Sequence, residues 1–339
     1  MKKAFSLFLF IGILISGCHM PAVNLSSTPT PTTPPITLTA APTQAPAATP
    51  TVSANHVVLV VPPNSDPQLA QDSEKTINEL AAAAGMNVVK VQSLNPEELN
   101  PGIKLIFYTA IANNIPQVVA AGPEIQFAII SPVDINPVPN FNVIRLQTER
   151  RTFISGMVTI LIADDWRSLA LLPIQDPPYT TLAEAFTNGA QHYCGICNAF
   201  FNPAARFPFV RQVDANNYQA MVDDANKSII YSIFVSPEVS TPEMISSLAA
   251  QKYILVGGET PPEDAKTFWA ATVRENVSPP IRQLWPEMMN GQGGKIVNTS
   301  ILLEDVNPNY LSTGKKALVL EAIQELENGL LLPLTPSMQ

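Results

Sequence analysis

The sequence has few of the residues on which most catalytic and metal sites depend. Its 339 residues include only three histidines and three cysteines. His19 and His56 bound a stretch without charged residues, which leaves His192 as the only histidine within the rest of the chain. No Gly-x-Ser-x-Gly turn, phosphate-binding glycine loop or zinc-protease motif occurs. We therefore predict no enzymatic activity, no catalytic residue, no metal site and no cofactor.

Basic residues are also scarce. The 19 lysines and arginines are outnumbered by 28 acidic residues, and the formal net charge is -9. A protein that binds nucleic acid needs a basic stripe to contact phosphates. No such stripe occurs in this sequence, so we expect no nucleic-acid partner.

Charge is absent altogether between His19 and His56, where no Asp, Glu, Lys or Arg occurs. Proline and threonine recur throughout residues 27–51, a composition that cannot form a hydrophobic core. Closely spaced prolines favour the extended polyproline II conformation. Residues 18–55 are therefore predicted to form a semi-rigid stalk that holds a folded region away from its attachment point.

The first residues are typical of an export signal. Lys2 and Lys3 precede an apolar segment, residues 4–15, which is too short to span a bilayer. The motif Ile15-Ser16-Gly17-Cys18 resembles the lipobox of bacterial lipoproteins. This resemblance implies that residues 1–17 are removed and that the acylated Cys18 anchors the chain to the extracytoplasmic face of the cell membrane. The alternative is an ordinary signal peptide with a free cysteine.

The remainder alternates apolar, β-branched runs with helix-like segments in two series. In the first series, strands are predicted at Val57–Val61, Asn87–Val91, Lys104–Tyr108, Phe127–Ile130 and Asn142–Leu146, with helices at Gln68–Ala84 and Ile115–Ala121. Asp66 is the expected cap of the first helix. An apolar helix at Arg151–Ala163 leads to the second series, with strands at Ser168–Leu172, Phe209–Val213, Ser228–Val235 and Tyr253–Val256 and helices at Tyr179–Gln191, Asn217–Lys227 and Pro242–Gln251. A strand at Lys295–Leu303 and a helix at Ser312–Glu327 follow.

This alternation predicts an α/β fold of two lobes, each a parallel sheet flanked by helices, linked by hinge crossovers. We expect the N-terminal lobe at 56–148, with part of 260–306 returning to it. The C-terminal lobe is expected at 149–259, followed by a closing segment at 307–339. Crossings between the lobes are expected near Thr148 and between Gly257 and Thr272. Ligands of such sheets bind beyond the carboxyl ends of the strands, so a cleft between the lobes is the predicted site.

Several short motifs resemble, in order, those of the basic membrane protein family of bacterial substrate-binding lipoproteins, which have the type I periplasmic-binding fold. They are Pro123-Glu124-Ile125-Gln126-Phe127-Ala128-Ile129-Ile130, Glu149-Arg150-Arg151-Thr152-Phe153-Ile154-Ser155-Gly156, Ala185-Phe186-Thr187-Asn188-Gly189-Ala190, Tyr253-Ile254-Leu255-Val256-Gly257-Gly258-Glu259 and Ala271-Thr272-Val273-Arg274-Glu275-Asn276-Val277. The resemblance implies a monomer that captures a small molecule, with a nucleoside as the family's usual ligand, for an ABC permease. The sequence departs from the family at Pro62-Pro63-Asn64-Ser65 and at Ser131, where the family has acidic residues, and at Arg274, where the family has lysine.

Candidate ligand-binding residues are the polar or aromatic groups at or just after predicted strand ends. They are Asn64, Thr109, Ser131, Asp176, Tyr179, Ser236, Glu259 and Arg274. For Glu259 and Arg274 the alternative is an ion pair at the surface or between the lobes. For Tyr179 the alternative is packing at the start of a helix.

The motif Cys194-Gly195-Ile196-Cys197 admits a structural disulfide, a redox-active dithiol, half of a metal site or free thiols. An exported chain favours the disulfide, which would pin the loop 194–203. A redox motif should begin at a helix N-terminus, but this one follows a predicted helix.

The sequence thus favours a solute-binding protein. The alternatives are a ligand-sensing or surface-interaction lipoprotein with the same fold, and a thiol oxidoreductase that uses Cys194 and Cys197.

Overall fold

The computed structural model describes residues 55–174, 176–214 and 216–335. The predicted signal peptide, Cys18 and the stalk up to residue 54 lie outside the described residues. Within the described ranges, no helix has the length and apolar character needed to cross a membrane.

The first sheet has six parallel strands in the order β2-β1-β3-β4-β5-β11. Their bounds are β1 (His56–Val60), β2 (Asn87–Val91), β3 (Ile103–Tyr108), β4 (Gln126–Ser131), β5 (Phe141–Arg145) and β11 (Ile296–Asn298). The helices α1 (Pro67–Ala83) and α7 (Ser278–Met289) pack on one face, and α2 (Ile115–Ala121) packs on the other with the turn η1 (Pro96–Glu98) nearby. Apolar side chains that alternate along each strand fill both helix–sheet interfaces.

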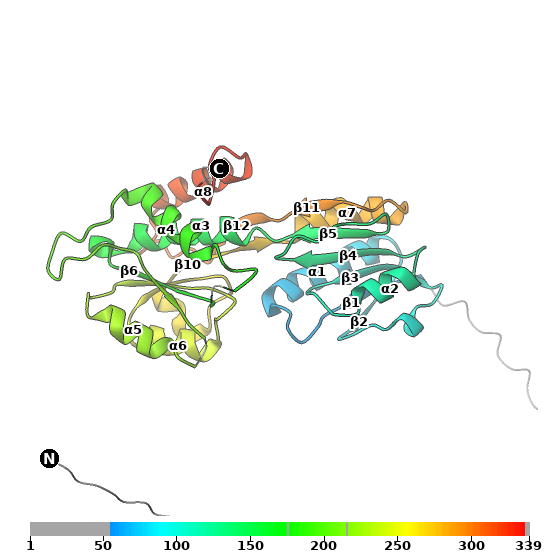
Figure 1. Ribbon diagram of the computed structural model, residues 1–339, viewed down its shortest axis with the longest axis horizontal. Coiled ribbons are helices and arrows are strands. Elements are labelled where there is room, and N and C mark those ends of the chain that lie inside the picture. The colour runs from blue at the N-terminus through cyan, green and yellow to red at the C-terminus, as the bar shows by residue number, and fades with distance from the viewer. Residues whose placement is uncertain (1–54, 175, 215, 336–339) are drawn as a thin grey trace, which may run out of the picture. The chain divides into compact units, whose positions relative to one another are not determined.

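The second sheet has the order β7-β6-β8-β9-β10-β12, in which only β12 is antiparallel to its neighbour. Its strands are β6 (Ser168–Leu172), β7 (Phe209–Gln212), β8 (Ser232–Val235), β9 (Ile254–Gly257), β10 (Trp269–Asn276) and β12 (Ser300–Glu304). One face is covered by α3 (Thr148–Ile162), α4 (Leu182–Cys194) and α8 (Thr313–Glu327), and the other by α5 (Tyr218–Asn226) and α6 (Pro242–Ala250). Short 3-10 turns, η2 (Asp164–Trp166) and η3 (Glu263–Phe268), complete the series. Figure 1 shows α5 and α6 on the opposite side of this sheet from α3, α4 and α8.

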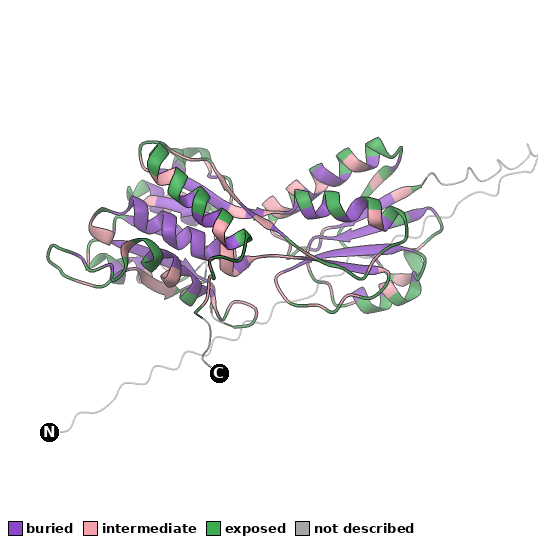
Figure 2. Cartoon of the chain, turned by 90° about the horizontal axis from the view of Figure 1, so that it is seen from above, coloured by how far each residue is buried: buried purple, intermediate pink, exposed green. Residues whose placement is uncertain are grey.

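Burial follows this layering. The central strands of both sheets are buried, whereas the edge strands and the outer faces of most helices are partly exposed (Figure 2). Helix α3 differs from the rest because, apart from Glu149 and Arg150, all its residues are buried. The predicted connection to the second series is confirmed, since α3 follows β5 of the first sheet and precedes β6 of the second.

Over the residues that the structure describes, the chain passes between the two sheets three times. It leaves the first sheet at Leu146 and Gln147, between β5 and α3, close to the expected crossing at Thr148. It returns at Val277, between β10 and α7, and leaves again at Thr299, between β11 and β12. The crossing expected between Gly257 and Thr272 is wrong, because β9 and β10 pair with each other in the second sheet.

The predicted α/β class with two parallel-dominated sheets is confirmed, and so are most element positions. The single strand predicted over Lys295–Leu303 is wrong, because Thr299 divides it into β11 and β12, which belong to different sheets. The prediction omits α7, which contains Pro279, Pro280 and Pro286. The first two occupy the initial turn, where the missing N–H groups have no helical partner in any case.

Helices α3 and α4 touch through their backbones at two glycines. A Cβ atom at Gly189 would lie 1.8 Å from the Phe153 carbonyl oxygen, and one at Gly156 would lie 2.1 Å from the Phe186 carbonyl oxygen. These neighbours are backbone atoms and cannot move aside as a flexible side chain would. Only glycine at both positions allows the two helices to pack this closely.

We predict that Gly189→Ala lowers the free energy of unfolding by about 1–3 kcal/mol or more, because the helices must separate to admit the methyl group. Urea unfolding followed by circular dichroism measures the change. The control is Gly314→Ala in α8, where a Cβ meets nothing within 4 Å. That variant should retain its stability or gain up to about 1 kcal/mol from helix propensity. Equal stability of the two variants would contradict the backbone-contact argument.

Candidate functional site

A cavity of about 610 Å³ lies beyond the carboxyl ends of strands from both sheets. Its lining comes mainly from the loops that follow β1, β3, β4, β6, β8 and β9, together with the start of α3 and the end of β10. The polar and charged residues that line it are Asn64, Ser65, Asp66, Thr109, Thr148, Arg151, Tyr179, Glu238, Ser240, Glu259 and Glu275. This is the position at which open α/β sheets bind ligands.

Proline residues form much of the apolar wall. Pro132 follows β4 directly, Pro173 follows β6 directly, and Pro237 comes two residues after β8. Proline has no N–H to donate to a neighbouring strand, so it ends the ladder and fixes the direction of the loop. The same residue type therefore ends three strands and shapes the wall that each loop presents to the cavity.

Five charged side chains line the cavity, and four of them are acidic. Asp66 caps the N-terminus of α1, with its Oδ1 accepting a hydrogen bond of 2.7 Å from the Leu69 backbone N–H, as the sequence predicts. Glu238, Glu259 and Glu275 come from the loops after β8 and β9 and from β10. Arg151, in the first turns of α3, is the only basic residue among the described residues of the lining. With all groups ionised, the lining has an excess of negative charge.

Arg151 is bound by two of these acids. Its Nη2 donates to Glu238 Oε1 at 2.6 Å, and its Nη1 donates to Glu275 Oε2 at 3.1 Å. The side chains of Arg151, Glu238 and Glu275 are only 4%, 14% and 6% exposed. Ser236 lies behind this group, and its hydroxyl donates to the second oxygen of Glu238. We call Arg151, Glu238 and Glu275 the buried ion triad.

Burial and charge oppose each other within the triad. Burial alone would lower the pKa of Arg151, but Glu238 and Glu275 raise it, so the guanidinium stays charged. Burial also acts to raise the pKa of Glu238, yet the nearby Arg151 and the hydrogen bond from Ser236 bring it below its usual value. For Glu275 burial dominates and its pKa is raised despite Arg151.

The negative charges of the other two acids, Glu259 and Asp66, are less fully balanced by nearby positive groups. Burial, followed by the charges of Asp66 and Glu238, raises the pKa of Glu259 to about 7. Burial also raises the pKa of Asp66, against its hydrogen bond from the Leu69 N–H and the attraction of Arg151. The pKa of the Tyr179 hydroxyl is raised by burial and then by Glu238. These mutual effects show that the acids of the cavity repel one another.

Four of the eight residues proposed from sequence line this cavity: Asn64, Thr109, Tyr179 and Glu259. The hydroxyl of Thr109 is 2.7 Å from that of Ser65, another lining residue. Tyr179 stands just before α4, at the rim shared with a neighbouring groove.

The other four lie elsewhere. Asp176 lines the neighbouring groove, Ser131 is fully buried and donates to the Val133 carbonyl at 2.9 Å, and Ser236 stands behind Glu238. Arg274 forms ion pairs with Asp72 of α1 and with Glu304 of β12, and its Nε lies 2.7 Å from the Glu304 carboxylate. It therefore joins elements of the two lobes, although its partner is not Glu259.

Sequence reasoning missed Arg151, Glu238 and Glu275 as cavity residues. Arg151 and Glu275 belong to motifs quoted for the family resemblance, but they lie on a helix and within a strand rather than in loops. Glu238 comes two residues after Ser236, so a search for polar residues just after strand ends could have identified it. Arg151 is one of three successive charged residues at the start of α3, and only the structure distinguishes it from Glu149 and Arg150 by its burial.

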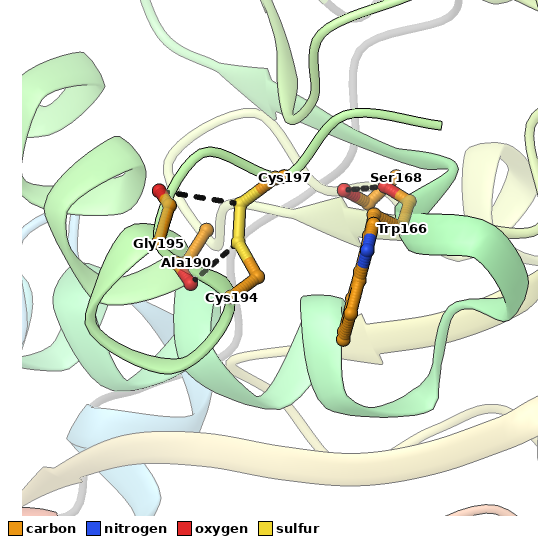
Figure 3. Close-up of a disulfide and its surroundings, with 6 residues drawn as sticks. All are labelled: Trp166, Ser168, Ala190, Cys194, Gly195 and Cys197. Atoms are coloured by element: carbon orange, nitrogen blue, oxygen red, sulfur yellow. Dashed lines mark hydrogen bonds between the residues drawn. A yellow bond between two sulfur atoms is a disulfide. The ribbon is translucent and has the colours of Figure 1, made fainter. Parts of the chain in front are cut away.

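Cys194 and Cys197 form a disulfide at the end of α4, with their Cα atoms 5.1 Å apart (Figure 3). Cys194 is the last residue of α4, and its sulfur lies 3.2 Å from the Ala190 carbonyl oxygen of the preceding turn. A helix C-terminus disfavours the thiolate that redox chemistry needs. The disulfide lies outside the lining of the cavity. No cluster of three side chains suited to a metal ion occurs in the part of the chain that the structure describes.

The loop after the disulfide is held by a second buried pair. Asp165 accepts hydrogen bonds from the backbone N–H groups of Phe200 and Phe201, at 2.6 and 3.2 Å, and pairs with Arg167. The Asp165 side chain is only 9% exposed. Burial acts to raise its pKa, while the two N–H groups and Arg167 lower it overall.

The architecture defines a protein with two α/β lobes of the type I periplasmic-binding fold. No protein-family model matches the chain, and no curated protein is similar to it in sequence. Among solved structures, an ABC transporter solute-binding protein from Conexibacter woesei is similar with a TM-score of 0.63 and 15% identity, over 84% of this chain and 99% of that one. A solute-binding protein from Aeropyrum pernix has a TM-score of 0.62 and 16% identity, over 83% and 94%. A transcriptional activator of the comK gene from Bacillus halodurans has a TM-score of 0.62 and 14% identity, over 82% and 100%. At these identities the likeness establishes the fold.

We predict that Arg151→Gln lowers the free energy of unfolding by about 3–5 kcal/mol at pH 7, because Glu238 and Glu275 are left as uncompensated buried charges. Both acids would then have a raised folded-state pKa. Stability lost in this way returns as the pH falls and the acids are protonated, so the deficit should shrink between pH 8 and pH 5. Chemical denaturation at each pH measures it.

Arg150→Gln is the matched control, because no ion pair of Arg150 is found among the described residues. It should change stability by less than about 0.5 kcal/mol. A double variant, Arg151→Gln with Glu275→Gln, should recover part of the loss. A loss for Arg151→Gln that is constant with pH would contradict the charge explanation.

We also predict a pH-dependent stability contribution from Glu259. Its folded-state pKa of about 7 is above the ordinary value of 4.5, so it stabilises the fold below pH 4.5 and loses this contribution as the pH rises to about 7. Glu259→Gln removes the dependence. The free energy of unfolding of the variant minus that of the wild type should increase by roughly 1–2 kcal/mol from pH 5 to pH 8, allowing for partial solvent exposure. Melting curves test this against the exposed control Glu124→Gln, and parallel pH profiles for all three proteins would refute it.

Proposed function

We propose that this protein captures a small molecule in the cavity and presents it to an ABC importer on the extracytoplasmic side of the membrane. The observation that carries the proposal is the cavity itself. It has room for a small organic molecule, and its polar groups come from the strand ends of both sheets. Ligand pockets in proteins typically combine apolar walls with a few placed polar groups of this kind.

The chain connectivity suits a binding mechanism based on hinge closure. Within the described ranges, three crossings, at Gln147, Val277 and Thr299, link the two lobes through the backbone. A ligand that contacts residues of both lobes would stabilise an arrangement in which they lie closer together. A permease could then distinguish the occupied from the empty protein by that arrangement.

We propose a lipid anchor on Cys18 and a place in the basic membrane protein family. The anchor rests on the lipobox-like motif, and the family on the ordered motifs between Pro123 and Val277. Two motif residues have a structural role that fits their presence, since Gly156 and Gly189 allow α3 and α4 to pack. The anchor would keep the binding protein near its permease, and the proline-rich stalk would give it reach.

A nucleoside is the ligand that the family resemblance suggests. The Tyr179 ring at the rim offers a face for stacking, and carboxylates such as Asp66 and Glu259 can accept hydrogen bonds from sugar hydroxyls. Redox activity has less support, because Cys194 ends a helix and the disulfide lies outside the cavity lining.

The proposal predicts that the full-length protein, purified in non-ionic detergent, is stabilised by a member of a panel of nucleosides, nucleobases, sugars, amino acids and amines. A ligand at about 100 times its dissociation constant adds roughly 2.7 kcal/mol, which appears as a higher melting temperature. Tyr179→Ala should weaken the response at least tenfold. Tyr231→Ala is the control, because Tyr231 is exposed and outside the cavity.

A folded protein that responds to no compound would count against solute capture and would favour a surface-interaction lipoprotein of the same fold. Equal responses of the Tyr179→Ala and Tyr231→Ala variants would place the binding site outside this cavity.

A further inference from the structure

We infer that the ligand of this cavity is a compact organic cation, an amine or guanidinium compound with a small body. The inference rests on the proposed solute-binding function and specifies its ligand. Four carboxylates, those of Asp66, Glu238, Glu259 and Glu275, face a single guanidinium in the lining. The negative charge that remains lies where burial strengthens its interaction with a bound cation.

Glu275 supplies the most direct evidence. Its side chain is 6% exposed, and only Oε2 accepts a hydrogen bond, from Arg151. No partner of Oε1 is found among the described residues, although this atom is buried and Glu275 lines the cavity. A buried carboxylate oxygen without a donor is costly, and native structures seldom retain one. A donor on the ligand would satisfy it.

Asp66 and Glu259 add a second reason. No ion pair of either acid is found in the described part of the chain, and the charge of Asp66 contributes to the raised pKa of Glu259. A neutral polyol could donate hydrogen bonds to both carboxylates but would leave their repulsion unchanged. A cation relieves that repulsion and also forms charge-assisted hydrogen bonds, which are roughly twice as strong as neutral ones.

The cation is organic rather than a metal ion. The described acids do not converge into any group of three that could hold a metal. The cavity of about 610 Å³ far exceeds the needs of a bare ion, and its walls include Leu69, Ile130, Leu146 and five prolines. Tyr179 offers an aromatic face to a cationic group. An apolar or hydroxyl-bearing body would contact these walls while its charged end reaches the acids.

Matched pairs of probes test the inference by isothermal titration of the full-length protein in non-ionic detergent. The pairs are choline and 3,3-dimethylbutan-1-ol, glucosamine and glucose, and putrescine and butane-1,4-diol. Within each pair the shape is similar and the positive charge differs. At least one cation should bind, with an affinity at least tenfold above that of its neutral counterpart.

Two variants remove charge while the fold is kept. Asp66→Asn retains a side chain that caps α1 well, and Glu259→Gln keeps the size of the side chain. Each should weaken binding of the cation about tenfold, a larger loss than for the neutral member of the same pair; equal losses for the two members would contradict the inference. Glu124→Gln, an exposed acid outside the cavity, should have no effect.

Proton release gives a readout that does not depend on the choice of variant. The charged groups that face Glu259 in the lining are Asp66, Arg151, Glu238 and Glu275, together with the Tyr179 hydroxyl. A cation bound among them favours the ionised form of Glu259, whose pKa is about 7, so binding should release protons and tighten several-fold from pH 6 to pH 8. Titrations at pH 7 in phosphate and in MOPS buffer, which differ in ionisation enthalpy and supply no cationic competitor, separate the heat of this proton release.

The possible failures are distinguishable. Binding of glucose, uridine or adenosine with no preference for any cation would overturn the inference and leave the proposed function intact. Binding of calcium ions in place of the organic cations would also overturn it. If no member of any pair binds and neither nucleoside does, both the inference and the proposed function fail.

Discussion

The cavity depends on one buried guanidinium. Arg151 fixes three separate parts of the second lobe to one another, namely the start of α3, the loop after β8 and the end of β10. Buried ion pairs seldom stabilise a protein more than apolar side chains of similar volume would. The triad is therefore poorly explained as a source of stability. It is better explained as the means of holding two carboxylates, those of Glu238 and Glu275, at the surface of a largely apolar cavity.

The end of β10 connects this triad to the crossings between the lobes. Neighbouring residues on a strand point to opposite sides, so Glu275 reaches Arg151 while Arg274 reaches Asp72 of α1 and Glu304 of β12. Two residues later, at Val277, the chain crosses to the first lobe. A movement of one lobe relative to the other changes the distances in the ion pairs of Arg274, and Arg274 is adjacent in sequence to the cavity residue Glu275. The crossing at Val277 and the cavity residue Glu275 therefore lie at the same end of β10.

The sequence predicts the fold well because both sheets consist of short, β-branched strands with helices between them. The prediction is wrong where the local sequence pattern does not reveal which sheet a strand joins. Residues 295–303 alternate like one strand, yet Thr299 separates two strands whose partners belong to different sheets. For the site, the strand-end rule finds Asn64, Thr109, Tyr179 and Glu259. It cannot find Arg151 or Glu275, which reach the cavity from within a helix and a strand, and whose pairing depends on segments more than 80 residues apart.

The distribution of charge around the cavity sets a condition on closure. Asp66 is the acid contributed by the first lobe, whereas Glu238, Glu259 and Glu275 come from the second. Asp66 is partly balanced by the N-terminus of α1 that it caps, and the triad is partly balanced by Arg151. Glu259 has neither form of compensation. Bringing the lobes together moves Asp66 toward Glu259, and this repulsion grows as water leaves the cavity. A neutral ligand does not remove that cost. A ligand with positive charge between the two acids does, and it would therefore couple its own binding to closure.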